Sequence, residues 1–420
     1  MSISQDIGKR LQGIVGAEYC RPAVDDDLAA RMKCSMTVSP GTEREIAEVL
    51  ACANDAGLTV LPCGGGTKMA WGNPPRRSDV LLSTKCLNRV IDHAWADLTV
   101  AVEAGCTMTE LQVTLAKQGQ RLALDCLWPS SATVGGVLST NDSGALRLRF
   151  GALRDLVIGV TIALPDGTLA TSGGKVVKNV AGYDLPKLVT GALGTLGVIT
   201  RAIFRTHPLC PDSLTLCFTA ADIEVAQSKI LAIQNSQLAH VALQIRCSQD
   251  APPEVDILFE GRASGLHAQE QQLQEIVGTS GAQKSGRENW SAKEELWNGA
   301  HQGSAIAKLS VLPTMLASTL ASLQKLGDTH RVKWKAVLQG TGIGWVRLDG
   351  HHAPLHAALT EVRARLESVG GSFTLLYWPA NSGVFDSWGN TGDSLPLMRA
   401  IKNQFDPKCT LNPGRFVGGI

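Results

Sequence analysis

The stretch LPCGGGTKMAWGNPP, residues 61–75, places three consecutive glycines directly after a short apolar run. Glycine-rich loops of this kind approach phosphates, because residues without a Cβ let several backbone N–H groups converge on one anion. In a Rossmann unit the loop opens a helix, but Pro74, Pro75 and the missing 3.6-residue apolar period exclude a helix here. The loop therefore predicts a phosphate site on another fold.

The composition limits the classes of function. The 420 residues include 39 basic and 38 acidic ones, with no basic block, which argues against a nucleic-acid partner. The eleven cysteines form no C-x-x-C pair, so we expect free thiols and no iron–sulfur cluster or zinc ribbon in this chain. The amino-terminal sequence has no apolar core of signal-peptide length, and no segment reaches the ~20 apolar residues of a membrane helix. These features predict a cytoplasmic protein.

The first half of the chain predicts short strands mixed with helices. Capping boxes at residues 42–45 and 107–110 predict helices that end near Gly57 and Gly119. Thr133 could lead a third, short helix whose amino end would face an anion. Strands are predicted at residues 58–61, 80–83, 88–93, 98–103, 122–124, 156–164, 168–171 and 198–204.

From residue 208 to residue 378 the pattern changes to two copies of one unit, each with strands and two helices. Strands are predicted at residues 214–218, 240–247, 255–259, 305–312, 332–338, 344–348 and 373–378. Helices are predicted at residues 223–233, 266–277, 313–326 and 354–369. Two split β-α-β units side by side predict an antiparallel sheet with helices on one face. The polar connector at residues 278–289 is expected to be exposed.

Three further segments share the composition of the opening loop: residues 128–144 (WPSSATVGGVLSTNDSG), 173–202 and 411–415 (LNPGR). Any one of them alone is explained as a tight turn, but four in order favour one phosphate site. Cys63 lies inside the first segment, where a small residue packed beside phosphate is commoner than a reactive thiol.

Together the motifs CGGGTK, PSSATVGGVLSTNDSG, RDLVIGVTIALPDG, KNVAGYDLPKLVTGALGTLGVIT and FDPKCTLNPGR resemble the FAD-linked oxidases of the vanillyl-alcohol oxidase type. Within that family the chain resembles the FAD-binding E subunits of bacterial glycolate oxidases. The resemblance implies an α+β fold. Residues 1–207 would form a PCMH-type FAD-binding domain of two subdomains, residues 208–405 an antiparallel-sheet cap domain, and residues 406–420 a tail that returns to the FAD domain.

The resemblance also implies a set of FAD-binding residues. The pyrophosphate would lie among Pro62, Gly64, Gly65, Gly66 and Thr67, with Ser131, Thr133, Gly135 and Gly136 opposite. Thr140, Asn141 and Gly144 would follow the flavin, Gly197, Val198 and Ile199 the adenosine, and Asn412 would reach toward the ring system. Lys68 would either add charge to this site or be solvated. Some relatives attach FAD through histidine or cysteine; the loop has no histidine and His93 lies in a predicted strand, so we expect non-covalent FAD.

By resemblance, the chain would be the FAD-binding subunit of a complex that oxidises a small 2-hydroxy acid to the 2-oxo acid, with hydride transfer to flavin N5. Its partners would be a second FAD-linked subunit and an iron–sulfur subunit, with at most peripheral membrane association through them. Two alternatives stay open. The chain could be a self-sufficient dehydrogenase of another small hydroxy acid or alcohol, or a non-catalytic FAD-binding scaffold for a catalytic paralogue.

The catalytic residues are not identified by sequence. Catalytic relatives carry a metal-binding G-D-G-N-x-H stretch, and this chain has only the histidine-rich residues 349–356 at that place. A tetrahedral site needs more ligands than His352 and His356, so we expect no metal. Leu193 stands where many relatives have an acid.

Two further positions have both a functional and an ordinary interpretation. Arg347 could pair with a substrate carboxylate, although a surface arginine is the default. Tyr377 and Trp378 could shape a pocket facing the flavin, although core packing is the commoner role of a tryptophan.

Overall fold

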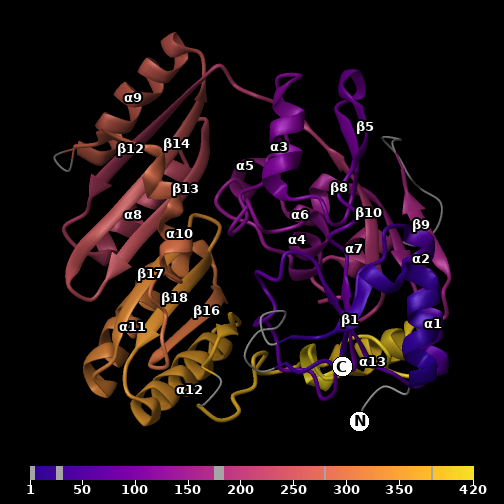
Figure 1. Cartoon of the computed structure of the whole chain (residues 1–420). Coiled ribbons are helices and arrows are strands. Elements are labelled where there is room, and N and C mark those ends of the chain that lie inside the picture. Colours follow the sequence, from indigo (N-terminus) through magenta and orange to yellow (C-terminus); the bar gives the residue numbers. More distant parts are fainter. Residues whose placement is uncertain (1–4, 25–31, 175–183, 279–280, 380–381) are drawn as a thin grey trace. The chain divides into compact units, whose positions relative to one another are not determined.

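The computed structural model describes residues 5–24, 32–174, 184–278, 281–379 and 382–420, and the chain divides into two compact units (Figure 1). The first unit comprises Met1–Ser143, Ala152–Leu209 and Thr391–Ile420, and the second comprises Gly144–Gly151 and Cys210–Asn390. Residues 391–405, assigned to the cap by the sequence, therefore group with the first unit. Residues 178–183, the start of the KNVAGYDLPK motif, lie outside the described part.

The glycine loop is carried by a four-stranded sheet in the first unit. Its strands, in spatial order, are β1 (Cys20–Pro22), β2 (Met36–Val38), β4 (Val80–Ser83) and β3 (Val60–Cys63). Strands β2, β4 and β3 are parallel. Helix α1 (Gln5–Val15) and helix α2 (Glu43–Asp55) share a core with this sheet, in which Ile46 and Leu50 are fully buried. Thr42 caps α2 by accepting a bond from Glu45 N, as the capping motif predicts.

A five-stranded antiparallel sheet forms the rest of the first unit. Its order is β5 (Val90–Ala94), β6 (Thr99–Glu103), β10 (Val198–Arg205), β8 (Val157–Ala163) and β9 (Leu169–Gly173). The helices of this part are α3 (Met108–Ala116), α4 (Val134–Thr140), α6 (Leu153–Leu156) and α7 (Leu185–Val189). Helix α13 (Leu395–Phe405) completes the unit.

One predicted strand, at residues 122–124, is wrong. The strand in this region is β7 (Gln120–Arg121), which pairs with β11 (His207–Pro208). At Leu122 the backbone is instead satisfied by a side chain, because Gln112 Oε1 accepts from Leu122 N at 3.1 Å and Gln112 Nε2 donates to Leu122 O at 2.6 Å.

The second unit is built on one eight-stranded antiparallel sheet. In spatial order its strands are β15 (Gln283–Ser285), β12 (Asp212–Thr219), β14 (Ala251–Gly261), β13 (His240–Ser248), β17 (Lys333–Gln339), β18 (Ile343–Asp349), β16 (Ser304–Ser310) and β19 (Ser372–Tyr377). Its long helices are α8 (Ile223–Gln234), α9 (Ala263–Val277), α11 (Leu316–His330) and α12 (His352–Ser368). All four pack on one face of the sheet in a single core, which confirms the predicted architecture (Figure 1). In the described part of the chain, no helix has the length and apolarity to cross a membrane.

Strand alternation decides which side chains face the helices. On β13, Leu243 and Ile245 enter the core with the helices, so Gln244 and Arg246 lie on the second face. The connector predicted to be exposed lies partly on this second face: β15 extends the sheet edge, and 3₁₀ helix η5 (Arg287–Ser291) and helix α10 (Ala292–Glu295) follow. Asn289 Nδ2 donates to the buried Asp256 carboxylate at 2.6 Å, which fixes the connector to the sheet.

Candidate functional site

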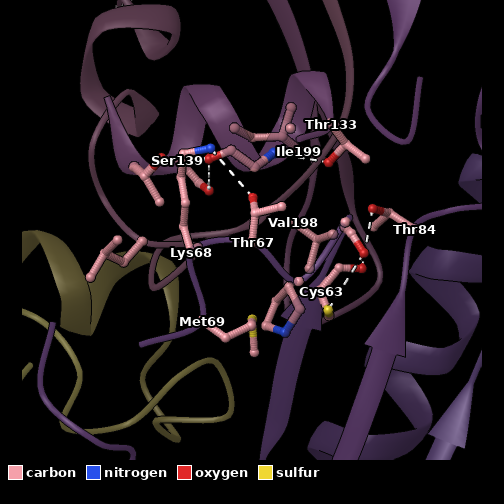
Figure 2. Close-up of a pocket in the computed structure, with 18 of the residues that line it drawn as sticks. Cys63, Thr67, Lys68, Met69, Thr84, Thr133, Ser139, Val198 and Ile199 are labelled. Atoms are coloured by element: carbon pink, nitrogen blue, oxygen red, sulfur yellow. Dashed lines mark hydrogen bonds between the residues drawn. The ribbon is translucent and has the colours of Figure 1, made fainter. Parts of the chain in front are cut away.

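The glycine loop after β3 forms one wall of a pocket within the first unit (Figure 2). Other walls come from α4 and from the start of β10. The pocket brings together these predicted residues: Pro62, Gly64, Gly65, Gly66, Thr67, Thr133, Gly135, Gly136, Thr140, Gly197, Val198 and Ile199. Segments far apart in the sequence therefore meet at one pocket.

The glycines of the loop are required by close approach. A Cβ on Gly65 would lie 1.7 Å from Ser131 O, and a Cβ on Gly64 would lie 2.0 Å from Thr133 Oγ1. At Gly66 the requirement for glycine is conformational, because its φ of +76° is unfavourable for a residue with a Cβ. Any side chain at Gly64 or Gly65 would force the two walls of the pocket apart.

The loop offers backbone donors to a ligand. Within the described residues, the N–H groups of Gly65, Gly66 and Thr67 donate to no protein atom. A row of such amides is the usual way in which a loop without a dedicated cation holds phosphate oxygens. The loop thus retains the chemistry that its sequence predicts.

Helix α4 brings its amino end to the pocket wall. Thr133 caps it as predicted, accepting from Gly136 N at 3.4 Å. However, Val134 N donates to Cys106 O and Gly135 N donates to Ala104 O, so the first amides of the helix are already used inside the protein. Whether the amino end of this helix faces an anion stays a prediction, and the unengaged N–H groups described above belong to the glycine loop.

Lys68 is neither solvated nor a free charge. Its side chain is buried, and Nζ lies 3.3 Å from Asp142 Oδ2, whose carboxylate is also buried. The ammonium also lies 5.9 Å from the ring centre of Trp71 and 5.5 Å from that of Trp128. Asp142 balances the charge of Lys68 beside the pocket.

A second cation, Arg415, lines the pocket and was not singled out by the sequence. Its side chain is buried, and Nη2 donates to Met69 O at 2.6 Å and to Trp71 O at 2.7 Å. Burial lowers the pKa of the guanidinium to about 10, so Arg415 remains protonated at neutral pH. Its position in the quoted LNPGR motif was the signal that could have identified it.

Four predicted residues do not line this pocket. Ser131 contributes through its backbone oxygen, which faces Gly65. Asn141 ends α4 with φ +49° and contacts Gly191. Asn412 donates from Nδ2 to Leu193 O at 2.6 Å, so it holds the pocket wall. Gly144 belongs to the second unit. Cys63, which the sequence predicts to pack beside the phosphate, also lines the pocket. The lining residues that the sequence did not indicate as site residues are Met69, Thr84, Ser139, Leu193, Gly194 and Arg415.

The residues present fit the pyrophosphate of a dinucleotide. The loop supplies amide donors, the glycines admit a backbone-close ligand, and Arg415 supplies a buried cation. The buried side-chain oxygens Asn141 Oδ1 and Asn412 Oδ1 have no hydrogen-bond partner in the described part of the chain. Both oxygens can therefore still accept a hydrogen bond.

The second unit uses its candidate substrate residues for its own structure. Arg347 donates to both carboxylate oxygens of Asp349, at 2.9 and 2.8 Å, and to the backbone oxygens of Leu296, Asn298 and Gly299. All of its nitrogens are therefore engaged, and it anchors residues 296–299 to β18. This arrangement gives no support to a role for Arg347 in binding a substrate carboxylate.

The histidines at residues 351–356 behave in the same way. His352 Nε2 lies 2.7 Å from Ser382 O, and the His356 ring lies 5.1 Å from that of Phe385 and 6.3 Å from that of Trp378. Trp378 itself is buried in this aromatic cluster and donates to Gly383 O, so it packs in the core of its own unit. Among the described residues, no group of three or more His, Cys, Asp or Glu side chains could hold a metal ion.

Two protein-family models match the chain. The model described as "FAD binding domain" matches residues 34–173, and the model described as "FAD linked oxidases, C-terminal domain" matches residues 388–416. Every residue that lines the pocket from Pro62 to Thr140 lies inside the first match, and Arg415 lies inside the second.

Curated relatives share a little over a quarter of their aligned residues with this chain. The chain is 27% identical over 254 residues to the "Glycolate oxidase subunit GlcD" of Bacillus subtilis, a match of 58% of this chain and 53% of that protein. It is 27% identical to the mitochondrial "D-2-hydroxyglutarate dehydrogenase" of Bos taurus, over 94% of this chain and 79% of that protein. It is 28% identical to the mitochondrial "D-lactate dehydrogenase [cytochrome]" of Arabidopsis thaliana, over 91% of this chain and 73% of that protein.

Solved structures confirm the fold. The chain matches p-cresol methylhydroxylase with a TM-score of 0.80 at 15% identity, over 98% of this chain and 97% of that one. It matches alkyldihydroxyacetonephosphate synthase with a TM-score of 0.77 at 15% identity, over 99% of this chain and 86% of that one. At these identities the likeness concerns the fold alone.

Proposed function

The chain belongs to the FAD-linked oxidases with a PCMH-type FAD-binding domain, and from this membership we propose that it is the FAD-binding subunit of a dehydrogenase complex acting on a small 2-hydroxy acid. The observation that carries the proposal is the pocket in the first unit. There the glycine loop, inside the region matched by the FAD model, offers free amides, and Arg415, inside the second matched region, adds a buried cation. The names of the three curated relatives described above refer to glycolate, D-lactate and D-2-hydroxyglutarate, which are all small 2-hydroxy acids.

In this proposal, the loop residues Gly65, Gly66 and Thr67 bind the pyrophosphate through their N–H groups. Arg415 adds a positive charge in a low-dielectric setting, where it counts for more than it would in water. Gly197, Val198 and Ile199 pack along the adenosine half. When bound, FAD would supply the hydride acceptor at N5, and the protein would orient the α-carbon of the substrate toward it.

The proposal keeps FAD non-covalent. His93 lies on strand β5, with its Nε2 3.1 Å from Gln120 Oε1, and does not line the pocket. Cys63 does line the pocket, but its thiol is buried and 3.5 Å from Gly64 O. A lone buried cysteine is more often a packing residue than an attachment point.

The proposed partners are a second FAD-linked subunit and an iron–sulfur subunit. The chain has no C-x-x-C pair that would indicate a cluster of its own, so electrons from reduced FAD would leave through another chain. In this scheme the complex acts in the cytoplasm, with any membrane contact made by the partners.

A scaffold function is the second candidate, and one observation favours it. Arg347 is saturated by protein groups and His352 and His356 pack on aromatic rings, so the second unit's most obvious candidates for substrate or metal binding are already engaged. In that case this chain would hold FAD, and a catalytic paralogue would oxidise the substrate.

One experiment separates these candidates. The FAD-loaded chain alone is mixed without oxygen with glycolate, D-lactate or D-2-hydroxyglutarate, and bleaching of the flavin absorbance is followed over time. Bleaching by one of them supports a catalytic subunit. Sustained turnover with a dye acceptor and no partner would instead support a self-sufficient dehydrogenase. No bleaching with any of the three would refute the catalytic proposal and favour the scaffold.

A further inference from the structure

Lys402 is a buried cation that the proposed function leaves without a role. It is the one residue of α13 that is fully buried, with 3% of its surface exposed. Its Nζ donates to Asp406 Oδ2 at 2.6 Å, to Thr195 O at 2.7 Å and to Leu411 O at 3.0 Å. A lysine ammonium has three donors, so all of them are used, and they join three separate segments.

Asp406, the partner of Lys402, organises the turn that follows α13. Its carboxylate is fully buried and accepts from Thr410 N and from Leu411 N, each at 2.8 Å. The next residue, Asn412, adopts φ +46° and its N–H donates to Val60 O at 3.1 Å. The ion pair therefore fixes the place at which the tail meets strand β3, directly before the glycine loop.

Asn412 in turn holds a second residue in an unfavourable conformation. Its Nδ2 donates to Leu193 O at 2.6 Å, and Leu193 has φ +50° while its own N–H donates to Ser139 O at 2.8 Å. A left-handed conformation is costly for leucine and persists only where its surroundings impose it. Here the surroundings are Asn412 on one side and α4 on the other.

These bonds converge on Gly194, which lines the pocket between Leu193 and Thr195. Lys402 bonds Thr195 O directly and reaches Leu193 O through Leu411 and Asn412, so it fixes the backbone on both sides of Gly194. We propose that Lys402, together with Asp406, is the positioning residue for this wall of the cofactor pocket, so that FAD affinity depends on the docking of the carboxyl-terminal tail. The proposal rests on the assignment of FAD to this pocket.

The consequence is measurable in Lys402→Met, which keeps the apolar stem of the side chain and removes its three bonds. We expect its Kd for FAD to rise by roughly 10- to 100-fold, the size of effect that groups orienting a binding site commonly have. Lys408→Met is the matched control, because Lys408 lies in the same tail, is exposed, and makes one bond of 3.3 Å to Asn54 O. This control should bind FAD as the wild type does.

Amide hydrogen exchange of the full-length apoprotein separates positioning from cofactor binding. In Lys402→Met, peptides covering residues 191–197 and 410–412 should exchange faster than in the wild type, while peptides from the second unit stay unchanged. The variant Asn412→Gly is a second test that spares the ion pair. It keeps the left-handed backbone accessible and removes only the bond to Leu193, so it should speed exchange at residues 191–197 alone.

Unchanged exchange at residues 191–197 in Lys402→Met would overturn the positioning role, whatever happens to FAD. Faster exchange with an unchanged Kd for FAD would also overturn it, because the wall would then move without consequence for the cofactor. If the wild type itself bound no FAD, the proposed function would fail, and the exchange data would then separately show whether Lys402 fixes the wall.

Discussion

We expect the single substitution Gly65→Ala to remove most of the affinity for FAD. The added Cβ would lie 1.7 Å from Ser131 O and 2.8 Å from Ser131 C, and both are backbone atoms. Ser131 cannot move away easily, because Ser131 N and Ala132 N both donate to Trp128 O, at 3.0 and 2.7 Å. The glycine loop must therefore shift by about 1 Å from the position in which it lines the pocket.

A shift of this size in groups that position a ligand costs on the order of 100-fold, or about 2.7 kcal/mol of binding free energy. The assay is a titration of apoprotein with FAD, followed by the quenching of flavin fluorescence. Gly13→Ala is the control: Gly13 lies in helix α1, nothing approaches its Cβ within 4 Å, and alanine should leave FAD binding unchanged. An affinity of Gly65→Ala within twofold of the wild type would refute the close-approach argument.

Three other outcomes follow from the same contacts. Lys68→Met leaves the Asp142 carboxylate buried without its cation, so it should lower the free energy of unfolding, measured in urea, by about 3–5 kcal/mol. Adding Asp142→Asn should recover part of the loss, and a loss under about 1 kcal/mol in the single variant would contradict the pairing. Arg347→Lys should lower the melting temperature without raising KM for a 2-hydroxy acid, whereas a raised KM at full stability would indicate a substrate contact. Burial favours the neutral form of Glu103, but bonds from the side chain and backbone of Arg89 outweigh it and hold the pKa of Glu103 below its ordinary value. Its contribution to stability is thus present above the ordinary glutamate range and lost as pH falls through the lowered pKa, and Glu103→Gln should flatten that part of the acid-unfolding curve.

Local rules predicted much of the fold because short-range chemistry decides it. The capping box at Thr107 and Glu110 forms with both reciprocal bonds. The alternation on β13 and β14 places one set of side chains against the helices. The strand predicted at residues 122–124 failed because a long-range partner, the Gln112 side chain, satisfies the backbone at Leu122. The pattern of apolar residues in a sequence does not indicate which side chain will bond to the backbone in this way.

The sequence predicted the glycine residues of the candidate site, but it did not predict the ion pairs and hydrogen bonds between side chains distant in the chain. Gly64 and Gly65 stand out in the sequence, and their close approaches explain why no other residue fits. The burial of Lys68 against Asp142, 74 positions later in the chain, could not be read from either residue alone. The bond from Asn412 Nδ2 to Leu193 O could not be read from the sequence either, and the assignment of Asn412 to the ring system stays a prediction.

The central claim is that the pocket beside the glycine loop holds FAD without a covalent bond. It is tested most directly by reconstituting the purified chain with FAD, removing unbound cofactor, and then precipitating the protein with acid. We expect one FAD per chain in the reconstituted protein and all of the flavin in the supernatant after precipitation. A chain that retains no flavin after reconstitution would contradict the assignment of the pocket, and flavin that stays with the precipitate would contradict non-covalent binding.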